Sequence, residues 1–150
     1  MKPTVCVDLY MLTDDLHDEA EDAMPLPAYG ALEFTHRLGK NLRVVIYCSS
    51  AMCMDTLHVA TYANKETIEK WLNNHSLYFD EVAYGPVKPI ASAYIDADAK
   101  TKVHPEETSE DVLERAAQFA ETLCGVDSDD SAYAIDAIKL DDSRIENINN

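Results

Sequence analysis

Near its N-terminus the chain has a short run that is apolar on both faces of an extended strand and ends on a carboxylate. Val5, Cys6 and Val7 are successive apolar residues, and Asp8 follows directly. Because side chains of a strand alternate between faces, such a run belongs inside a parallel sheet that helices cover. Ligands of open α/β sheets bind at the carboxyl ends of the strands, where we expect Asp8 to lie. A turn-capping role for Asp8 is the alternative.

The rest of the chain alternates segments with strand-like and helix-like patterns. Strands are predicted at 42–48, 81–84, 93–96 and 101–104, and helices at 28–39, 55–75 and from 108 onward. The last helix is expected to bury Val112, Leu113, Ala116, Phe119 and Leu123. This alternation favours a single α/β domain over residues 1–124, with a three-layer parallel sheet and helices on both faces. Residues 125–150 are polar and acidic, and we expect an extension that is at most partly ordered.

The charge of the chain limits its partners. The formal net charge is −16, so binding to nucleic acid or to an anionic membrane is not expected, because both are polyanions. An acidic surplus serves solubility, cation binding or docking onto a basic protein surface. The start of the sequence has no signal-peptide pattern, and no run is long and apolar enough for a membrane span. Cys6 and Cys48 fall in apolar runs, so we expect reduced cysteines and a cytoplasmic protein.

Polar groups follow four of the predicted strands. Asp8 ends the first strand, Ser49 and Ser50 follow the second, Lys88 lies in the loop after the third, and Asp96 ends the fourth. In a parallel sheet all of these lie at the same edge. An acid nucleophile, hydroxyls, an amine and a second acid are the groups that magnesium-dependent phosphoryl transfer requires. Taken singly, each has an ordinary interpretation as a turn residue, a cap or a solvated charge.

In the order of Asp8, Ser49, Lys88 and Asp96 the chain resembles the haloacid dehalogenase (HAD) superfamily, especially its small capless phosphatase-like members. The similarity extends over residues 3–123 and includes PLPAYGALEFTHRLGKNLRVVIYCSS. It implies a Rossmann-like sheet without a cap domain. It also implies roles for the individual residues: Asp8 as nucleophile, Ser49, Ser50 and Lys88 as phosphate ligands, and Asp8, Asp96 and Asp98 as Mg²⁺ ligands, together with the backbone carbonyl of Tyr10.

The chain departs from the family pattern around the nucleophile. Tyr10 stands where a second aspartate acts as general acid and base, and a tyrosine with an ordinary pKa of about 10 transfers protons poorly near neutrality. Met11 and Leu12 replace a glycine and a threonine, and Ala97 replaces a carboxylate. Tyrosine at this position occurs in true dehalogenases, but those enzymes keep the Gly-Thr pair and carry a cap.

Two hypotheses follow from these departures. The first is a protein with a degenerate phosphatase site that binds a small phosphorylated ligand or a basic protein surface, with little or no hydrolase activity. The alternative is a slow magnesium-dependent phosphohydrolase that uses Asp8 as nucleophile and recruits Asp14 or Asp15 as the acid.

Overall fold

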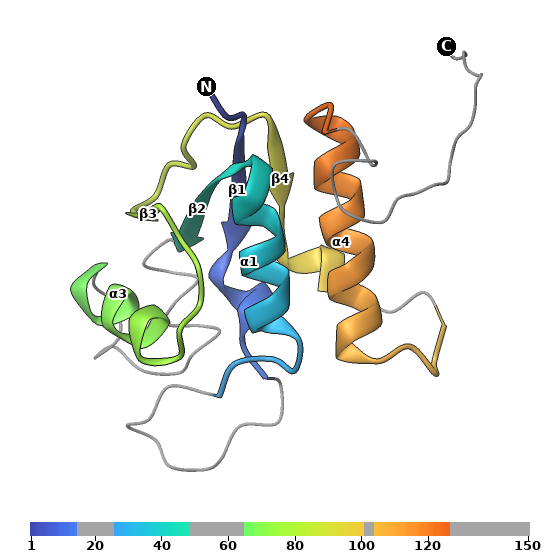
Figure 1. The fold of residues 1–150 in the computed structure, drawn as a ribbon. Helices are drawn as coiled ribbons and strands as arrows, with labels where there is room; N and C mark the ends of the chain where they lie inside the picture. The colour runs from blue at the N-terminus through green and yellow to red at the C-terminus, as the bar shows by residue number, and fades with distance from the viewer. Residues whose placement is uncertain (15–25, 49–64, 101–103, 127–150) are drawn as a thin grey trace.

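The computed structural model describes residues 1–14, 26–48, 65–100 and 104–126, and these residues form an α/β structure around a parallel sheet (Figure 1). Within these ranges the sheet has four strands in the order β3-β2-β1-β4. The strands are β1 (Thr4–Asp8), β2 (Arg43–Cys48), β3 (Glu81–Tyr84) and β4 (Ala93–Ile95). The helices are α1 (Ala31–Asn41), α3 (Lys65–Asn74) and α4 (Ser109–Leu123), with 3-10 turns η1 (Leu9–Leu12) and η3 (Ala97–Lys100). The predicted α/β class with a parallel sheet is confirmed.

Strand β1 lies inside the sheet, with β2 on one side and β4 on the other. Val5 is in register with Val44 of β2 and with Ala93 of β4, and both pairings are parallel. Val5, Cys6 and Val7 are all buried. A strand segment that has neighbours at both edges and is buried on both faces is apolar on both faces, which is why Val5–Val7 lacks the polar alternation of a surface strand.

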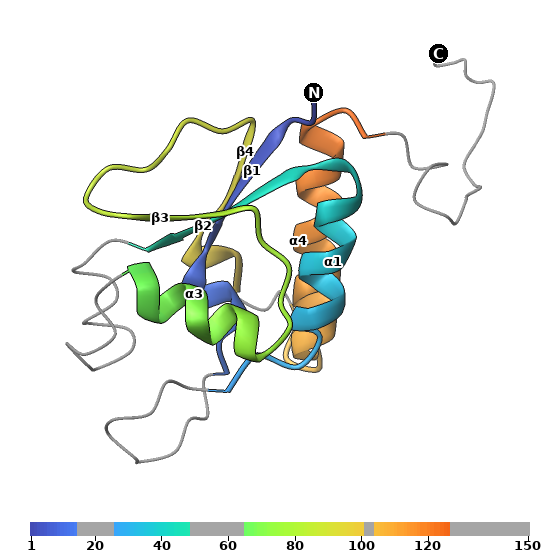
Figure 2. The same cartoon turned by 60° about the vertical axis from the view of Figure 1, so that its left-hand side comes forward.

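Helices α1 and α4 lie side by side against the sheet, and α3 lies apart from that pair beside β3 (Figure 2). The inner face of α1 buries Phe34 and Leu38. Arg37 joins the two helices: its guanidinium donates to both carboxylate oxygens of Glu121, at 3.0 and 2.8 Å, and lies 2.9 Å from Glu114. A bidentate arginine–carboxylate pair of this kind fixes orientation as well as distance.

Helix α4 begins with a capping box. The Thr108 hydroxyl accepts from the backbone N–H of Asp111, and the Asp111 carboxylate accepts from the N–H of Thr108. The predicted burial of Val112, Leu113 and Ala116 is confirmed. It is wrong for Phe119 and Leu123, which are 52% and 56% exposed. Phe119 lines an open cavity between α4 and β4, so its ring faces the sheet without being covered.

Other boundaries differ from prediction by a few residues. Helix α1 begins at Ala31 rather than at 28, because Gly30, at φ 95°, turns the chain into the helix through a left-handed conformation. Within α1, Gly39 lies under the Tyr78 ring, and a Cβ at this position would overlap that ring. The predicted elements at 55–64, 101–103 and beyond 126, with most of the proposed extension 125–150, lie outside the described residues.

The predicted reduced state holds for two of the described cysteines and not for a third. Cys6 and Cys124 are free thiols, and burial raises the pKa of Cys6 to about 11, as expected of an unreactive core thiol. The prediction of a reduced thiol is wrong for Cys48, which is disulfide-bonded at the end of β2, where the chain leaves the sheet. In the described part of the chain no helix combines the length and apolar character needed to cross a membrane.

Candidate functional site

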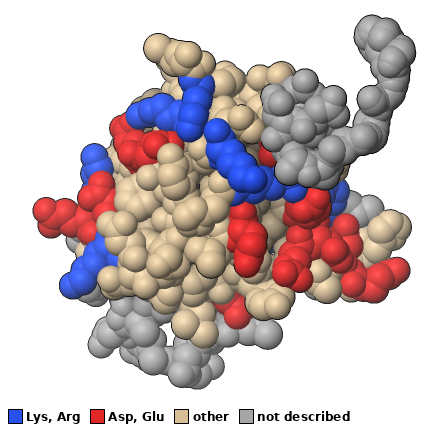
Figure 3. Space-filling view, viewed as in Figure 1, with Lys and Arg blue, Asp and Glu red and all other residues tan. Residues whose placement is uncertain are grey.

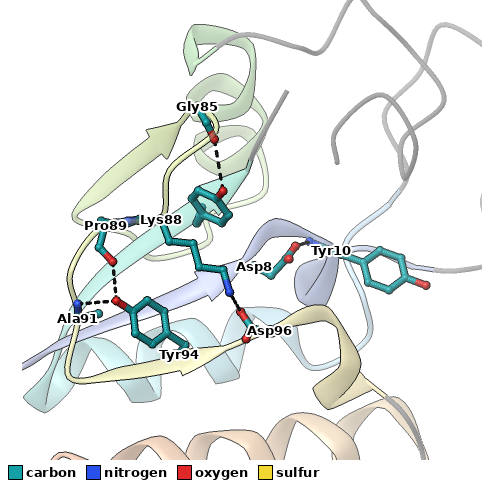
Figure 4. A network of polar contacts seen from close by, with 9 residues as sticks. Asp8, Tyr10, Gly85, Lys88, Pro89, Ala91, Tyr94 and Asp96 are labelled. Atoms are coloured by element: carbon teal, nitrogen blue, oxygen red, sulfur yellow. Dashed lines mark hydrogen bonds and ion pairs between the residues drawn. The ribbon is translucent and has the colours of Figure 1, made fainter. Parts of the chain in front are cut away.

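Two aspartates lie next to each other at the carboxyl edge of the sheet. Val7 is paired with Ile95, so the residues that follow them, Asp8 at the end of β1 and Asp96 just after β4, lie at the same edge of the sheet. Lys88 reaches this edge from the loop between β3 and β4, and its Nζ lies 2.6 Å from Oδ1 of Asp96 (Figure 4). The structure thus brings together three of the predicted site residues. Ser49 and Ser50 lie outside the described residues.

Asp8 is the buried member of this group, with an exposed fraction of 3%. Its Oδ1 accepts from the backbone N–H of Tyr10 at 2.8 Å, so the carboxylate caps η1. Asp8 therefore caps this turn and also lies at the end of the strand. Burial raises the pKa of Asp8 to about 6; the Tyr10 N–H opposes the rise, the charge of Asp96 adds to it, and Lys88 and Lys100 lower it.

Lys88 and Asp96 form the exposed rim of the site. Their side chains are 43% and 46% exposed, and the pair accordingly contributes little to stability. The hydrogen bond to Asp96 raises the pKa of Lys88, and the lysine stays charged at neutral pH. Lys88 also lies over the Tyr94 ring, with 5.5 Å between Nζ and the ring centroid. An accessible charged pair beside a buried acid is a surface that a charged partner can contact.

Two tyrosines hold the loop that carries Lys88. The Tyr94 hydroxyl donates to the carbonyl of Pro89 at 2.7 Å and accepts from the N–H of Ala91 at 3.1 Å. The Tyr47 hydroxyl donates to the carbonyl of Gly85 at 3.3 Å. These bonds are visible in Figure 4, and they fix the loop on both sides of the lysine. Lys88 is therefore presented from an anchored loop.

The turn after Asp8 is closed by a lysine that the sequence reasoning did not identify. The Nζ of Lys100, at the end of η3, donates to the carbonyl of Tyr10 at 3.0 Å and to that of Thr13 at 2.6 Å. The same Nζ lies 4.0 Å from the centroid of the Tyr10 ring. In the sequence, Lys100 is distinguished only by its position four residues after Asp96, and a basic residue at such a position is common in any loop.

The three aspartates expected as metal ligands do not all come together among the described residues. In the ranges that the structure describes, no three His, Cys, Asp or Glu side chains form a group that could hold a metal ion, so Asp8, Asp96 and Asp98 do not form one. Asp98 lines a cavity of about 410 Å³ between β4 and α4, together with Asp96 and Arg115, and Asp8 is not part of that lining. The Tyr10 carbonyl, predicted as a further ligand, already accepts three hydrogen bonds, two from Thr13 and one from Lys100.

The phenol of Tyr10 does not take the position of a proton donor. Figure 4 shows its ring directed away from Asp8, Lys88 and Asp96. A general acid must come within hydrogen-bond reach of the reacting group, whatever its pKa. The described part of the site thus offers a buried acid and an exposed ion pair, and the Tyr10 phenol is not placed to move a proton there.

The comparisons with known proteins add little to this geometry. No family model and no curated protein matches the chain. A crystal structure of a protein from Vibrio cholerae is similar over 81% of this chain and 98% of its own, with 23% identity and a TM-score of 0.45. Its description gives no activity, and a likeness at these values carries no argument about function.

Proposed function

We propose that this chain is a HAD-like protein with a degenerate phosphatase-type site, which acts by binding a basic protein surface and hydrolyses little or nothing. The proposal includes a Rossmann-like three-layer arrangement without a cap domain. One observation carries it: Asp8 is 3% exposed, and its carboxylate is held by the N–H of Tyr10. A nucleophile must reach phosphorus in line with the leaving group, and a buried, capped carboxylate is poorly placed for that attack.

The charge of the surface supports a basic partner. The chain has 28 acidic and 12 basic residues, and acidic side chains gather over α4 on the face in Figure 3. Glu106 and Glu110, before and at the start of α4, are exposed. Complementary charge steers association and suppresses partners of like charge. A basic protein is therefore favoured over a phosphorylated ligand, which the same field repels.

The first test measures catalysis. Purified protein with Mg²⁺ and an aryl phosphate is expected to show no turnover above that of Asp8→Asn. Turnover that is abolished in Asp8→Asn would instead support the alternative, a slow magnesium-dependent phosphohydrolase. That alternative has one observation in its favour, since Asp8 lies at the same edge as the Lys88–Asp96 pair.

The second test measures binding. Proteins retained by the native chain from its host are compared with those retained by a Glu106→Gln/Glu110→Gln variant. A Glu66→Gln/Glu69→Gln variant carries the same charge change on α3 and is the matched control. We expect a basic partner whose capture falls with added salt and with the first variant only. Capture that is insensitive to salt and to both variants would contradict the electrostatic argument.

A further inference from the structure

A cation is already bound at the turn that follows Asp8, and it belongs to the chain. The Lys100 ammonium lies between the carbonyls of Tyr10 and Thr13, at 3.0 and 2.6 Å, and 4.0 Å from the centroid of the Tyr10 ring. Carbonyl oxygens and the face of an aromatic ring are groups that hold cations in proteins. These three contacts come from η1 and the residue after it, the segment that follows Asp8 directly.

The carbonyl of Tyr10 has no capacity left for a metal ion. It accepts from the N–H of Thr13 at 3.3 Å, from the Thr13 hydroxyl at 3.0 Å and from Lys100 at 3.0 Å. A carbonyl oxygen has two lone pairs, so three donors already exceed the usual complement. A divalent cation at this oxygen would have to displace the ammonium or stand next to it, and like charges at such a distance repel strongly.

The lysine reaches this position because of the order of the strands. Lys100 ends η3, which follows β4, and β4 is the neighbour of β1 in the sheet. The turns after the two strands, η1 and η3, contact each other. A lysine at the end of η3 can therefore extend across to the turn that follows Asp8, without any other change in the fold.

We infer that the Lys100 ammonium takes the Tyr10 carbonyl that the family resemblance assigns to Mg²⁺, so the chain supplies its own positive charge at the turn after Asp8 and takes no divalent metal there. The residues present do not fit the magnesium site that the sequence led us to expect. This inference rests on the proposed function, since a fixed ammonium is suited to a site that binds rather than to one that turns over. Lys100 is a positioning residue for η1 in this scheme.

The test is a comparison of metal binding in the native chain and in Lys100→Met, which keeps the length of the side chain and removes the charge. Thermal melting is recorded with EDTA and with Mg²⁺. We expect the native melting temperature to be the same in both, and Lys100→Met to melt lower in EDTA and to recover part of the loss with Mg²⁺. Lys70→Met, on the exposed surface of α3, is the matched control and should behave as the native chain.

A second measurement uses the native chain alone, so the inference does not depend on the variant folding. Mn²⁺ is added in place of Mg²⁺, and the amide signals of Leu9 to Thr13 are followed by NMR. They should keep their intensity. Selective broadening of these signals, or a Mg²⁺-dependent rise in the native melting temperature, would overturn the inference. So would a Lys100→Met protein that is as stable as the native chain and indifferent to Mg²⁺.

The outcomes separate this inference from the proposed function. A native chain that hydrolyses an aryl phosphate in EDTA would refute the binding function and leave the fixed ammonium in place. A native chain that binds Mn²⁺ at η1 without any hydrolysis would refute the fixed ammonium and leave the binding function in place.

Discussion

Replacing Asp8 by asparagine tests whether this carboxylate is held in a setting that disfavours its charge. Asn keeps an oxygen that can accept from the Tyr10 N–H at 2.8 Å, and it removes the ionisable group. Burial raises the pKa of Asp8 from 3.8 to about 6. In the folded protein the Asp8 carboxyl therefore stays protonated to a higher pH than it does in the unfolded chain. Because the unfolded chain loses this proton first, the free energy of unfolding falls as the pH rises from 3.8 through 6.

The magnitude follows from the size of the shift. About two pKa units correspond to about 3 kcal/mol of lost stability above pH 6, at 1.36 kcal/mol for each unit. Roughly half of this, about 1.4 kcal/mol, is lost between pH 5 and pH 8. The variant has no such loss, so its free energy of unfolding, minus that of the native chain, should increase by about 1.4 kcal/mol over that range.

The assay is urea denaturation of both proteins at several pH values between 5 and 8. Other carboxylates titrate in both proteins, so their contributions largely cancel in the difference. A carbon-detected NMR titration of Asp8 in the native chain gives its pKa independently. A stability difference that does not change with pH, or an Asp8 carboxyl that titrates near 3.8, would refute the assignment of Asp8 as a destabilised buried acid.

Three further substitutions test how the site is supported. Gly39→Ala should lower the free energy of unfolding by about 1–3 kcal/mol in urea denaturation, because the new methyl overlaps the Tyr78 ring, and an unchanged stability would contradict that contact. Glu121→Gln should cost about 1–3 kcal/mol, since it leaves part of the Arg37 guanidinium without its carboxylate, and a neutral result would mean that Glu114 suffices alone. Tyr94→Phe should lower stability by about 1 kcal/mol and speed amide exchange at Ala91, whereas unchanged exchange would show that the hydroxyl does not anchor the loop.

The fold was predictable where the sequence pattern reports burial directly. The run from Val5 to Val7 is apolar on both faces of the strand, and this pattern predicted an inner strand. The prediction was right because both faces of the strand are covered. Asp8, Lys88 and Asp96 could be assigned to one edge because parallel strands end on the same side of a sheet. The exposure of Phe119 and Leu123 was not predictable, since helical spacing places them on the apolar stripe and only the neighbours of α4 decide what is covered.

The contacts made by Lys100 could not be predicted from the sequence either. Nothing in the pattern ADAK indicates that its lysine extends to a turn ninety positions earlier in the chain. That contact depends on β1 and β4 being neighbours and on the geometry of two short turns, both of which are set by tertiary structure. The disulfide of Cys48 was missed for a similar reason, because an apolar run around a cysteine argues for burial and says nothing of oxidation state.

The central place of β1 has a consequence for biosynthesis. This strand leaves the ribosome before its partners in the sheet, which are supplied by residues near 44 and near 93. Until the second of these emerges, one edge of β1 has no partner and is open to pairing with other nascent chains. The sheet can thus be completed only after β4 has emerged, and holdase chaperones that shield the emerging β1 should improve the yield of the protein.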